Sequence, residues 1–153
     1  FLMWRHLMEY RIILCPIETP EISEKGVDAA SYLSKLSGAR LILLHVVENW
    51  YRSEAVTTDS PEWAAIHQEW LDEGSKLLND AEAQARKTGL INVETVLKEG
   101  DIAHEIVAEA KKRRADIIVM STVRHSTIER FFIGSVIDMV TKSAPCPVLW
   151  MNI

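Results

Sequence analysis

Short apolar runs alternate with longer amphipathic stretches along the chain. The continuous apolar runs RIILC at 11–15 and LILLHVV at 41–47 are typical of strands that are buried on both faces of a sheet. The run INVETVL at 91–97 mixes apolar and polar positions, which indicates a strand at the edge of a sheet. The segment 116–120, which is apolar from 117 onward, and the apolar run at 148–151 bring the expected strands to five.

Helical periodicity fills the intervals between these strands. Thr19 with Pro20 predicts the start of the first helix, and Gly38 predicts its end. Its buried face is expected to consist of Ile22, Ala29, Ala30, Leu33 and Leu36. A second and longer helix is predicted from Ser60 to Gly89. We expect its residues Trp63 and Trp70 to pack on the sheet or on a partner.

Two more helices complete the pattern. Asp101 is the expected N-cap of the third helix, and the fourth is predicted to run from Gly134 through Lys142. Strands that alternate with helices predict an α/β fold with a parallel sheet and helices on both faces, which is a three-layer sandwich. No repeat or linker interrupts the pattern, so a single domain over residues 1–153 is expected.

Composition narrows the class of protein. Hydrophobic residues make up 48% of the 153 residues and charged residues 25%, which is ordinary for a globular chain with its own core. The formal net charge of −5 argues against binding to nucleic acid or to an anionic membrane. The basic run at 111–114 falls where a helix is expected to end, so we interpret it as complementing the helix dipole. No apolar run approaches the ~18 residues of a membrane span.

The cysteines and histidines give little support for metal or redox chemistry. Cys15 and Cys146 lie in apolar surroundings, which favours buried thiols in a reduced, cytoplasmic protein over a disulfide framework. The five histidines and two cysteines show no ligand spacing, so no metal site is predicted. The chain begins with Phe and shows no signal-peptide pattern. We expect residues 1–9 to be flexible or partly foreign to the natural chain, and no functional argument rests on them.

The loop at 120–135 is the strongest candidate for chemistry. The fourth apolar run ends at Met120 in a polar segment, and a new helix pattern begins at Gly134 and Ser135. A strand that leads through a loop of small residues into a helix N-terminus is a common way to hold phosphates and other anions. In an open parallel sheet, ligands bind at the carboxyl ends of the strands, where the strand order reverses. The segments 16–18 and 45–47 end two other strands and are further candidates.

Four stretches of the chain resemble the universal stress protein family. They are ILCPIE at 13–18, LILLHVVE at 41–48, EGDIAHEIVAEAKKRRADIIVM at 99–120 and ERFFIGSVIDMVTKSAPCPVLWM at 129–151. The likeness extends from about Tyr10 to Ile153, and the combination of GSV with APCPVL in the last stretch is the most specific part of it. The resemblance implies a five-stranded parallel sheet in the order 3-2-1-4-5, with the reversal between the first and fourth strands. It also implies a homodimer through the last strand.

The ATP-binding branch of that family carries the loop pattern G-x2-G-x9-G-[ST] after the fourth strand. The marked positions here are Ser121, Arg124, Gly134 and Ser135, so the spacing is kept and the first two glycines are missing. Glycines in such a loop let phosphate oxygens approach backbone N–H groups. Arg124 brings a long side chain, and a positive φ there would cost roughly 1–2 kcal/mol. Its guanidinium also offers a cation to a phosphate or another anion.

The base end of the implied site departs from the family pattern as well. Glu18 replaces an aspartate, and its additional methylene would crowd a pocket that is shaped for Asp. Its carboxylate still accepts a hydrogen bond from an adenine amino group or a ribose hydroxyl. The resemblance assigns the following residues to the nucleotide site: Pro16, Ile17, Glu18, Val46, Met120, Ser121, Arg124, Gly134, Ser135 and Val136.

Two functions follow from these departures. The first is a homodimeric stress-response or regulatory protein with an altered nucleotide pocket and weak or no ATP binding. The alternative is a switch protein that binds ATP or another adenine nucleotide through the loop 120–135. A His125–Ser126 pair of base and nucleophile lacks a third orienting group, so we predict no catalytic residue and at most slow ATP hydrolysis.

Several side chains admit a structural interpretation beside a functional one. His45 is interpreted as a hydrogen-bonded core histidine rather than a base or a ligand, and Cys15 as an inert buried thiol rather than a reactive one. Arg124 and Arg130 either face solvent, bridge a dimer or bind an anion.

The last predicted strand carries large apolar side chains that would be unusual on a solvent-exposed edge. Pairing of this strand with a second copy of the chain would bury them, and packing within one chain is the alternative. The expected dimer residues are Val148, Leu149, Trp150 and Met151.

Overall fold

The computed structural model describes residues 9–49, 59–122 and 134–153. Within these ranges strands and helices alternate as predicted. They are β1 (Ile12–Pro16), α1 (Pro20–Ser37), β2 (Arg40–Glu48), α2 (Pro61–Lys87), β3 (Val93–Gly100), α3 (Ile102–Arg113), β4 (Ile117–Thr122), α4 (Ser135–Ser143) and β5 (Val148–Asn152). All strand pairs are parallel and the order is β3-β2-β1-β4-β5, so the α/β class and the order 3-2-1-4-5 are confirmed.

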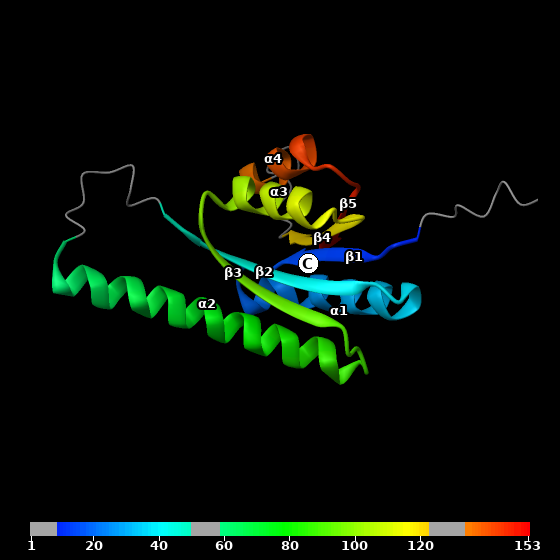
Figure 1. The fold of residues 1–153 in the computed structure, drawn as a ribbon, viewed down its shortest axis with the longest axis horizontal. Helices are drawn as coiled ribbons and strands as arrows, with labels where there is room; N and C mark the ends of the chain where they lie inside the picture. The colour runs from blue at the N-terminus through cyan, green and yellow to red at the C-terminus, as the bar shows by residue number, and fades with distance from the viewer. Residues whose placement is uncertain (1–8, 50–58, 123–133) are drawn as a thin grey trace, which may run out of the picture.

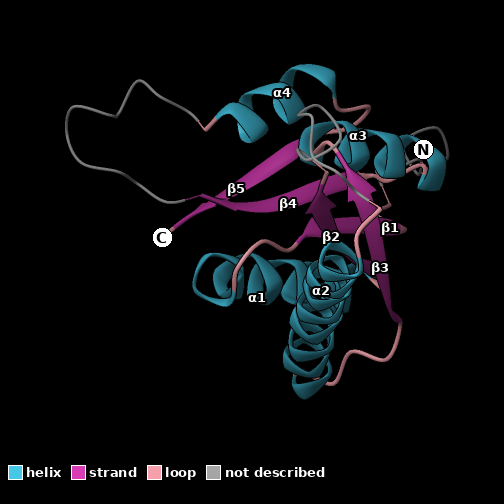
Figure 2. Ribbon diagram, turned by 90° about the vertical axis from the view of Figure 1, so that its left-hand side faces the viewer, coloured by secondary structure: helices cyan, strands magenta, loops and turns pink. Residues whose placement is uncertain are grey.

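The sheet is the middle of three layers (Figures 1 and 2). Helices α1 and α2 cover one face, and α3 and α4 cover the other. Neighbouring residues of one strand face opposite layers, and both layers are apolar: Cys15 packs under α1 and α2, whereas Leu14 packs under α3 and α4. Burial on both faces explains why β1 and β2 read as continuous apolar runs.

The helix boundaries follow from local signals in the sequence. The side chain of Ser60 accepts a hydrogen bond from the backbone N–H of Trp63 at 3.1 Å, and Asp101 accepts one from His104 at 2.8 Å. Each bond satisfies one of the donors that a helix start leaves free. Gly38 ends α1 with φ of 74°, a left-handed conformation that favours glycine. Among the described helices, none is long and apolar enough to cross a bilayer.

The predicted buried face of α1 is wrong in detail. Leu36 is 68% exposed, and Ile22 and Leu33 are only half-buried. The residues that face the sheet are mostly small: Ser23, Gly26, Val27, Ala30, Ser31 and Ser34. Small side chains let a helix lie close to the strands below it, and this stripe is hard to see in a sequence because hydrophobic periodicity gives weight to large apolar residues.

A network of ion pairs joins α3 to the edge strand β3. The guanidinium of Arg113 donates to both carboxylate oxygens of Glu94, at 2.6 and 3.0 Å, and to Glu109 at 2.9 Å. The side chain of Glu109 is 2% exposed, and Lys98 on β3 lies 3.7 Å from it. A buried carboxylate needs such partners, so the network holds β3 under α3.

Candidate functional site

The candidate site lies at the carboxyl end of the sheet, where β1 and β4 separate. These strands pair at only two positions, Ile13 with Ile117 and Leu14 with Ile118. The backbone of Ile17 donates to Leu44 on β2 at 2.7 Å, so in a parallel strand the backbone of Pro16 faces β4. Proline has no N–H to donate, and the pairing with β4 therefore stops there. The resulting crevice is at the point where the strand order reverses, which is the usual ligand position in this class of sheet.

Hydrogen bonds fix the segment that follows β1. The backbone N–H of Glu18 donates to the hydroxyl of Ser23 at 2.8 Å. The carbonyl of Ile17 accepts a bond of 2.7 Å from Nδ1 of His45. Because a carbonyl only accepts, the His45 proton sits on Nδ1. His45 is thus hydrogen-bonded, as predicted, although it is half-buried rather than fully buried.

The side chain of Glu18 is also half-buried. Burial raises the pKa of its carboxyl group, and the neighbouring His45 opposes this shift in part. The charged carboxylate is therefore less stable at Glu18 than on an open surface, and Glu18 takes up a proton at a higher pH than usual. Space for His45 comes from α2, because a Cβ at Gly74 would lie 2.7 Å from Cδ2 of His45.

The two apolar residues that were assigned to the base pocket are buried. Val46 and Met120 are 7% and 2% exposed, and both belong to the apolar layer beneath α3 and α4. Val46 lies on β2 and Met120 on β4, and β1 lies between these two strands. Their role in contacting a base stays a prediction.

Ser121 stands at the position of the first missing glycine, and its side chain turns away from the layer of Met120. A Cβ built on Gly26 of α1 would lie 2.5 Å from Oγ of Ser121. This oxygen is buried and has no hydrogen-bond partner among the described residues. The hydroxyl therefore fills the space that Gly26 leaves under α1. The role of Gly26 was not predicted, because the sequence does not show which distant side chain packs against a glycine inside a helix.

The far end of the loop is the start of α4. Gly134 is the N-cap and Ser135 the first helical residue, both exposed, while Val136 is half-buried against the apolar layer. No described atom lies within 4 Å of a Cβ on Gly134, so this side of α4 faces open space in the described part of the chain. Four predicted loop residues, Arg124, His125, Ser126 and Arg130, lie outside the described residues.

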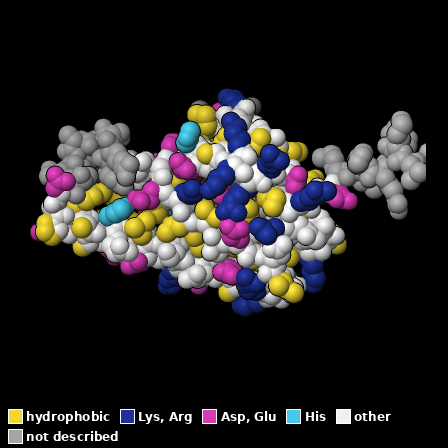
Figure 3. All heavy atoms as spheres, in the orientation of Figure 1, with side chains coloured by type: hydrophobic (Ala, Val, Ile, Leu, Met, Phe, Trp, Pro, Cys, Tyr) yellow, Lys and Arg dark blue, Asp and Glu magenta, His cyan; other side chains and the backbone are white. Residues whose placement is uncertain are grey.

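Charge is distributed unevenly between the two ends of the sheet. The described ends of β1, β2 and β4 and the first turns of α1 and α4 contain no Lys or Arg. They do contain four carboxylates, which are Glu18, Glu21, Glu48 and Asp138, and Asp138 pairs with Lys142 at 2.8 Å. Lys25, in the next turn of α1, donates to the carbonyl of Asn152 at the end of β5 at 3.5 Å. In Figure 3, Lys and Arg side chains gather over the middle and right of the face, towards the opposite, amino end. The described carboxyl end of the sheet therefore carries more carboxylates than cations, which disfavours a polyanion.

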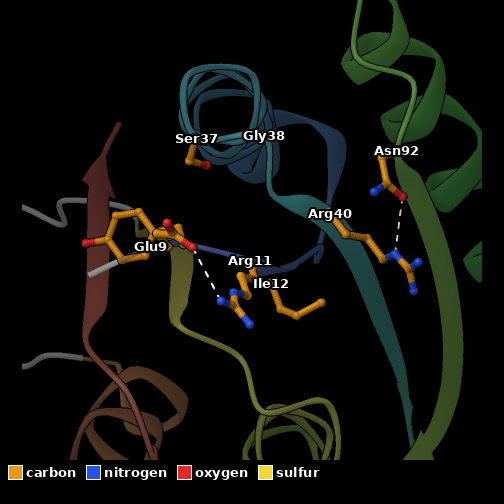
Figure 4. Close-up of a pocket in the computed structure, with 8 residues that line it drawn as sticks. Glu9, Arg11, Ile12, Ser37, Gly38, Arg40 and Asn92 are labelled. Atoms are coloured by element: carbon orange, nitrogen blue, oxygen red, sulfur yellow. Dashed lines mark hydrogen bonds and ion pairs between the residues drawn. The ribbon is translucent and has the colours of Figure 1, made fainter. Parts of the chain in front are cut away.

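Figure 4 shows a second hollow, at the amino end of the sheet, with a volume of about 540 Å3. Arg11 and Arg40 line it, and each already has a partner: Arg11 pairs with Glu9 at 3.4 Å, and Arg40 donates to Asn92 at 3.2 Å. α1 ends beside it at Gly38. Because helix C-termini carry partial negative charge, the arginines there complement the helices rather than form a free anion site.

Neither the thiols nor the metal-ligating side chains of the described residues form a second centre. Cys15 is fully buried, and burial raises the pKa of its thiol to about 12, which agrees with the prediction of an inert thiol. Cys146 is half-buried, and its pKa is raised by burial and by Asp116. In the described part of the chain, no three His, Cys, Asp or Glu residues come together in a way that could hold a metal ion.

Comparison with known proteins gives consistent results. The sequence profile of the "Universal stress protein family" matches residues 9–151. The chain is 34% identical to universal stress protein YxiE of Bacillus subtilis over 146 residues, which cover 90% of this chain and 95% of the relative. It is 32% identical to universal stress protein MJ0531 of Methanocaldococcus jannaschii over 141 residues, which cover 92% and 81% of the two chains.

Solved structures share the fold. The hypothetical protein MJ0577 superimposes with a TM-score of 0.78 at 22% identity, over 95% of this chain and 98% of the other. A universal stress protein of Archaeoglobus fulgidus in complex with dAMP superimposes with a TM-score of 0.67 at 23% identity, over 94% and 98%. A universal stress protein in complex with cAMP gives 0.71 at 23% identity, over 94% and 97%.

Proposed function

The chain belongs to the universal stress protein family, and from this premise we propose that it is a non-enzymatic stress-response or regulatory protein that binds ATP weakly or not at all. The observation that carries the proposal is the excess of carboxylates at the described carboxyl end of the sheet, with Glu18 directly after β1. ATP brings about four negative charges, and each carboxylate within a Debye length of roughly 8 Å opposes them. The family resemblance assigns Glu18 to the base end of the site, where its side chain is one methylene longer than the aspartate of the family pattern. Its backbone N–H is fixed by a bond of 2.8 Å to Ser23.

The loss of the first glycine is less of an obstacle than its sequence position implies. The hydroxyl of Ser121 is buried under α1 at Gly26, so it takes no space from a ligand above the loop. We therefore assign the block to Arg124 and to the carboxylates at this end of the sheet.

Calorimetry with ATP and Mg²⁺ tests the proposal, with Arg124→Gly as the informative variant. The wild type should bind ATP with a Kd above about 1 mM, which corresponds to a binding free energy weaker than about −4.1 kcal/mol. Arg124→Gly should bind ATP more tightly. Arg114→Gly is the matched control, because Arg114 is exposed and has φ of 53°, which glycine tolerates. Micromolar binding by the wild type would refute the proposal.

The second candidate is an adenine-nucleotide-binding switch. In its favour are the crevice beyond Pro16, the buried Val46 and Met120, and the open space beside Gly134. Two proteins of similar fold were solved in complex with cAMP and dAMP, which carry fewer phosphate charges than ATP. Titration with AMP beside ATP tests this candidate, because a switch requires saturable micromolar binding of ATP or of another adenine nucleotide.

We propose further that the protein is a homodimer through β5. Among the described strands β5 ends the sheet and pairs only with β4, and Leu149 is 38% exposed while Trp150 and Met151 are half-buried. Light scattering at high micromolar concentration should give twice the chain mass, 17.4 kDa, and Leu149→Lys should give a monomer. The control is Ile91→Lys, since Ile91 is 85% exposed and lies away from β5. A monomeric wild type would contradict the proposal.

A further inference from the structure

The large apolar residues of α1 lie on a side of the helix that does not face the sheet. Four of them recur at spacings of seven, four and three residues and form an apolar stripe, which consists of Ile22, Ala29, Leu33 and Leu36. Leu36 is 68% exposed, and the other three are half-buried. The residues that pack on the sheet are a different and mostly small set. Packing among the described residues therefore explains only part of the hydrophobic periodicity of α1.

The apolar stripe turns toward β5. The other flank of α1 faces α2, because Gln84 of α2 donates to the side chain of Asp28 at 2.7 Å. On the side of the stripe, Nζ of Lys25 donates to the carbonyl oxygen of Asn152 at the end of β5, at 3.5 Å. Lys25 and Ala29 are four residues apart, which places them on one side of the helix. In Figure 2, α1 accordingly lies closer to the C-terminus than α2 does.

The strand β5 presents apolar side chains on the same face of the sheet. Residues that pair in a parallel ladder face the same layer, and Leu149 pairs with Val119 of the layer under α1 and α2. Met151 packs against that layer as well. Leu149 is nevertheless exposed. The apolar stripe and the outer side of β5 thus adjoin on one face of the molecule.

The middle of the apolar stripe is level with the middle of β5. A Cβ on Gly26 would touch Ser121, and Ser121 pairs with Met151. α1 leads from the end of β1 back to the start of β2, so it runs antiparallel to the strands. Ala29 lies three residues beyond Gly26, a rise of roughly 4.5 Å along the helix. A strand residue spans roughly 3.3 Å, so Ala29 stands one to two residues before Met151, at the centre of β5.

We propose that a second copy of this chain covers the apolar stripe, and that the stripes of the two copies pack against each other above a pair of antiparallel β5 strands. The inference rests on the homodimer proposed above and adds α1 to its interface. Two identical antiparallel strands are related by a two-fold axis perpendicular to the sheet, so both copies turn α1 to the same side. With this axis through the middle of β5, Ala29 faces the partner's Ala29. Leu36 then meets the partner's Ile22, because both lie seven residues from Ala29, in opposite directions.

The dimensions of such a pair suit side-chain contact between the helices. α1 packs mainly on β4 and β1. Neighbouring strands lie roughly 4.8 Å apart, so the three steps from β4 through both copies of β5 to the partner's β4 span roughly 14 Å. Helices in contact lie roughly 8–10 Å apart, which leaves a furrow that Leu33 and Leu36 of both copies can fill. β5 has five residues, so strand pairing alone leaves most of the roughly 1,200–2,000 Å2 of a stable interface to other contacts.

Two charged variants test which residues meet between the copies. Leu36→Lys should raise the Kd of the dimer by roughly tenfold or more, because it puts a charge into an apolar contact twice per dimer. Ile22→Glu should do the same. When the two variants are mixed, one end of the mixed dimer keeps the wild-type pair and the other brings the introduced cation opposite the introduced carboxylate. Native mass spectrometry should therefore show more mixed dimer than random association gives.

The matched control is Ile91→Lys, which puts the same charge on an exposed apolar residue just before β3, the other edge of the described sheet. Its dimer Kd should stay within about twofold of the wild type. A monomeric wild type would overturn the β5 dimer and this inference together. A dimer that Leu149→Lys dissociates and Leu36→Lys leaves at wild-type affinity would overturn this inference alone. Random mixing of the two charged variants would do so too, because the stripe would then be covered by something other than a second copy.

Discussion

A glycine-to-alanine change at position 26 tests how the loop position 121 is occupied. A Cβ on residue 26 would lie 2.5 Å from Oγ of Ser121, a distance that real Cβ contacts do not reach. The backbone N and Cβ of Ser121 are at 3.5 and 3.6 Å, so the conflict is with the hydroxyl alone. Removing that hydroxyl should therefore remove the conflict.

The magnitude follows from two opposing effects. Overpacking of a buried interface costs about 1–3 kcal/mol. Replacing a glycine inside a helix by alanine gains about 1 kcal/mol, because alanine has less backbone freedom to lose. In the wild-type background Gly26→Ala should thus destabilise the fold by about 0–2 kcal/mol, and in the Ser121→Gly background it should stabilise it by about 1 kcal/mol. The coupling energy of the double-mutant cycle equals the overpacking cost.

Urea unfolding of the four proteins, at one protein concentration, gives the coupling energy. The control cycle combines Gly26→Ala with Thr122→Gly, because the side chain of residue 122 points to the opposite face of β4 from that of residue 121. The changes in unfolding free energy caused by Thr122→Gly and by Gly26→Ala should therefore add. If Gly26→Ala stabilises the wild type and the Ser121→Gly background equally, the hydroxyl does not lie under α1, and Ser121 would return to the list of direct obstacles in the loop.

Three other results are expected. Arg113→Ala should cost about 2–4 kcal/mol in urea unfolding at pH 7, because it leaves the buried carboxylate of Glu109 with only the more distant Lys98, and an unchanged midpoint would rule this network out as a support of β3. A hydrogen bond from Arg113 lowers the pKa of Glu94, so the folded state binds fewer protons than the unfolded state. The stability that results is present above about pH 4.3 and is lost as the pH falls through the folded pKa. Glu94→Gln should therefore lose less stability than the wild type when the pH is lowered through that range. A disulfide-exchange reagent should modify Cys146 in the folded protein and Cys15 only on unfolding, because Cys15 is fully buried with a pKa of about 12, and fast reaction of both thiols would contradict its burial.

The sequence predicts the arrangement of the elements because their signals are local. Continuous apolar runs, the caps at Ser60 and Asp101 and the stop at Gly38 each act over a few residues, and the structure places them as expected. The strand order came from the family resemblance, and it is confirmed. The face of α1 was predicted wrongly because close packing needs Gly26 and serines, whereas periodicity favours Leu36.

The position of the candidate site could be predicted from the sequence, but the contacts of its side chains could not. Pro16 marks the end of the first strand in the sequence, but its effect on pairing depends on which neighbour its backbone faces. The same holds for Ser121, because its side chain direction depends on the register of β4 and on the helix above it. These are properties of contacts between distant segments.

The central claim is that the crevice keeps the architecture of a nucleotide site without its affinity for ATP. Amide NMR during parallel titrations with ATP and with tripolyphosphate tests it most directly, because both carry a triphosphate and only ATP carries a base. The account predicts that both ligands give similar small shifts at Gly134 and Ser135, without saturation below about 1 mM, and no shifts at Ile17, Val46 or Met120. Saturable micromolar shifts at Ile17, Val46 and Met120 with ATP alone would contradict it.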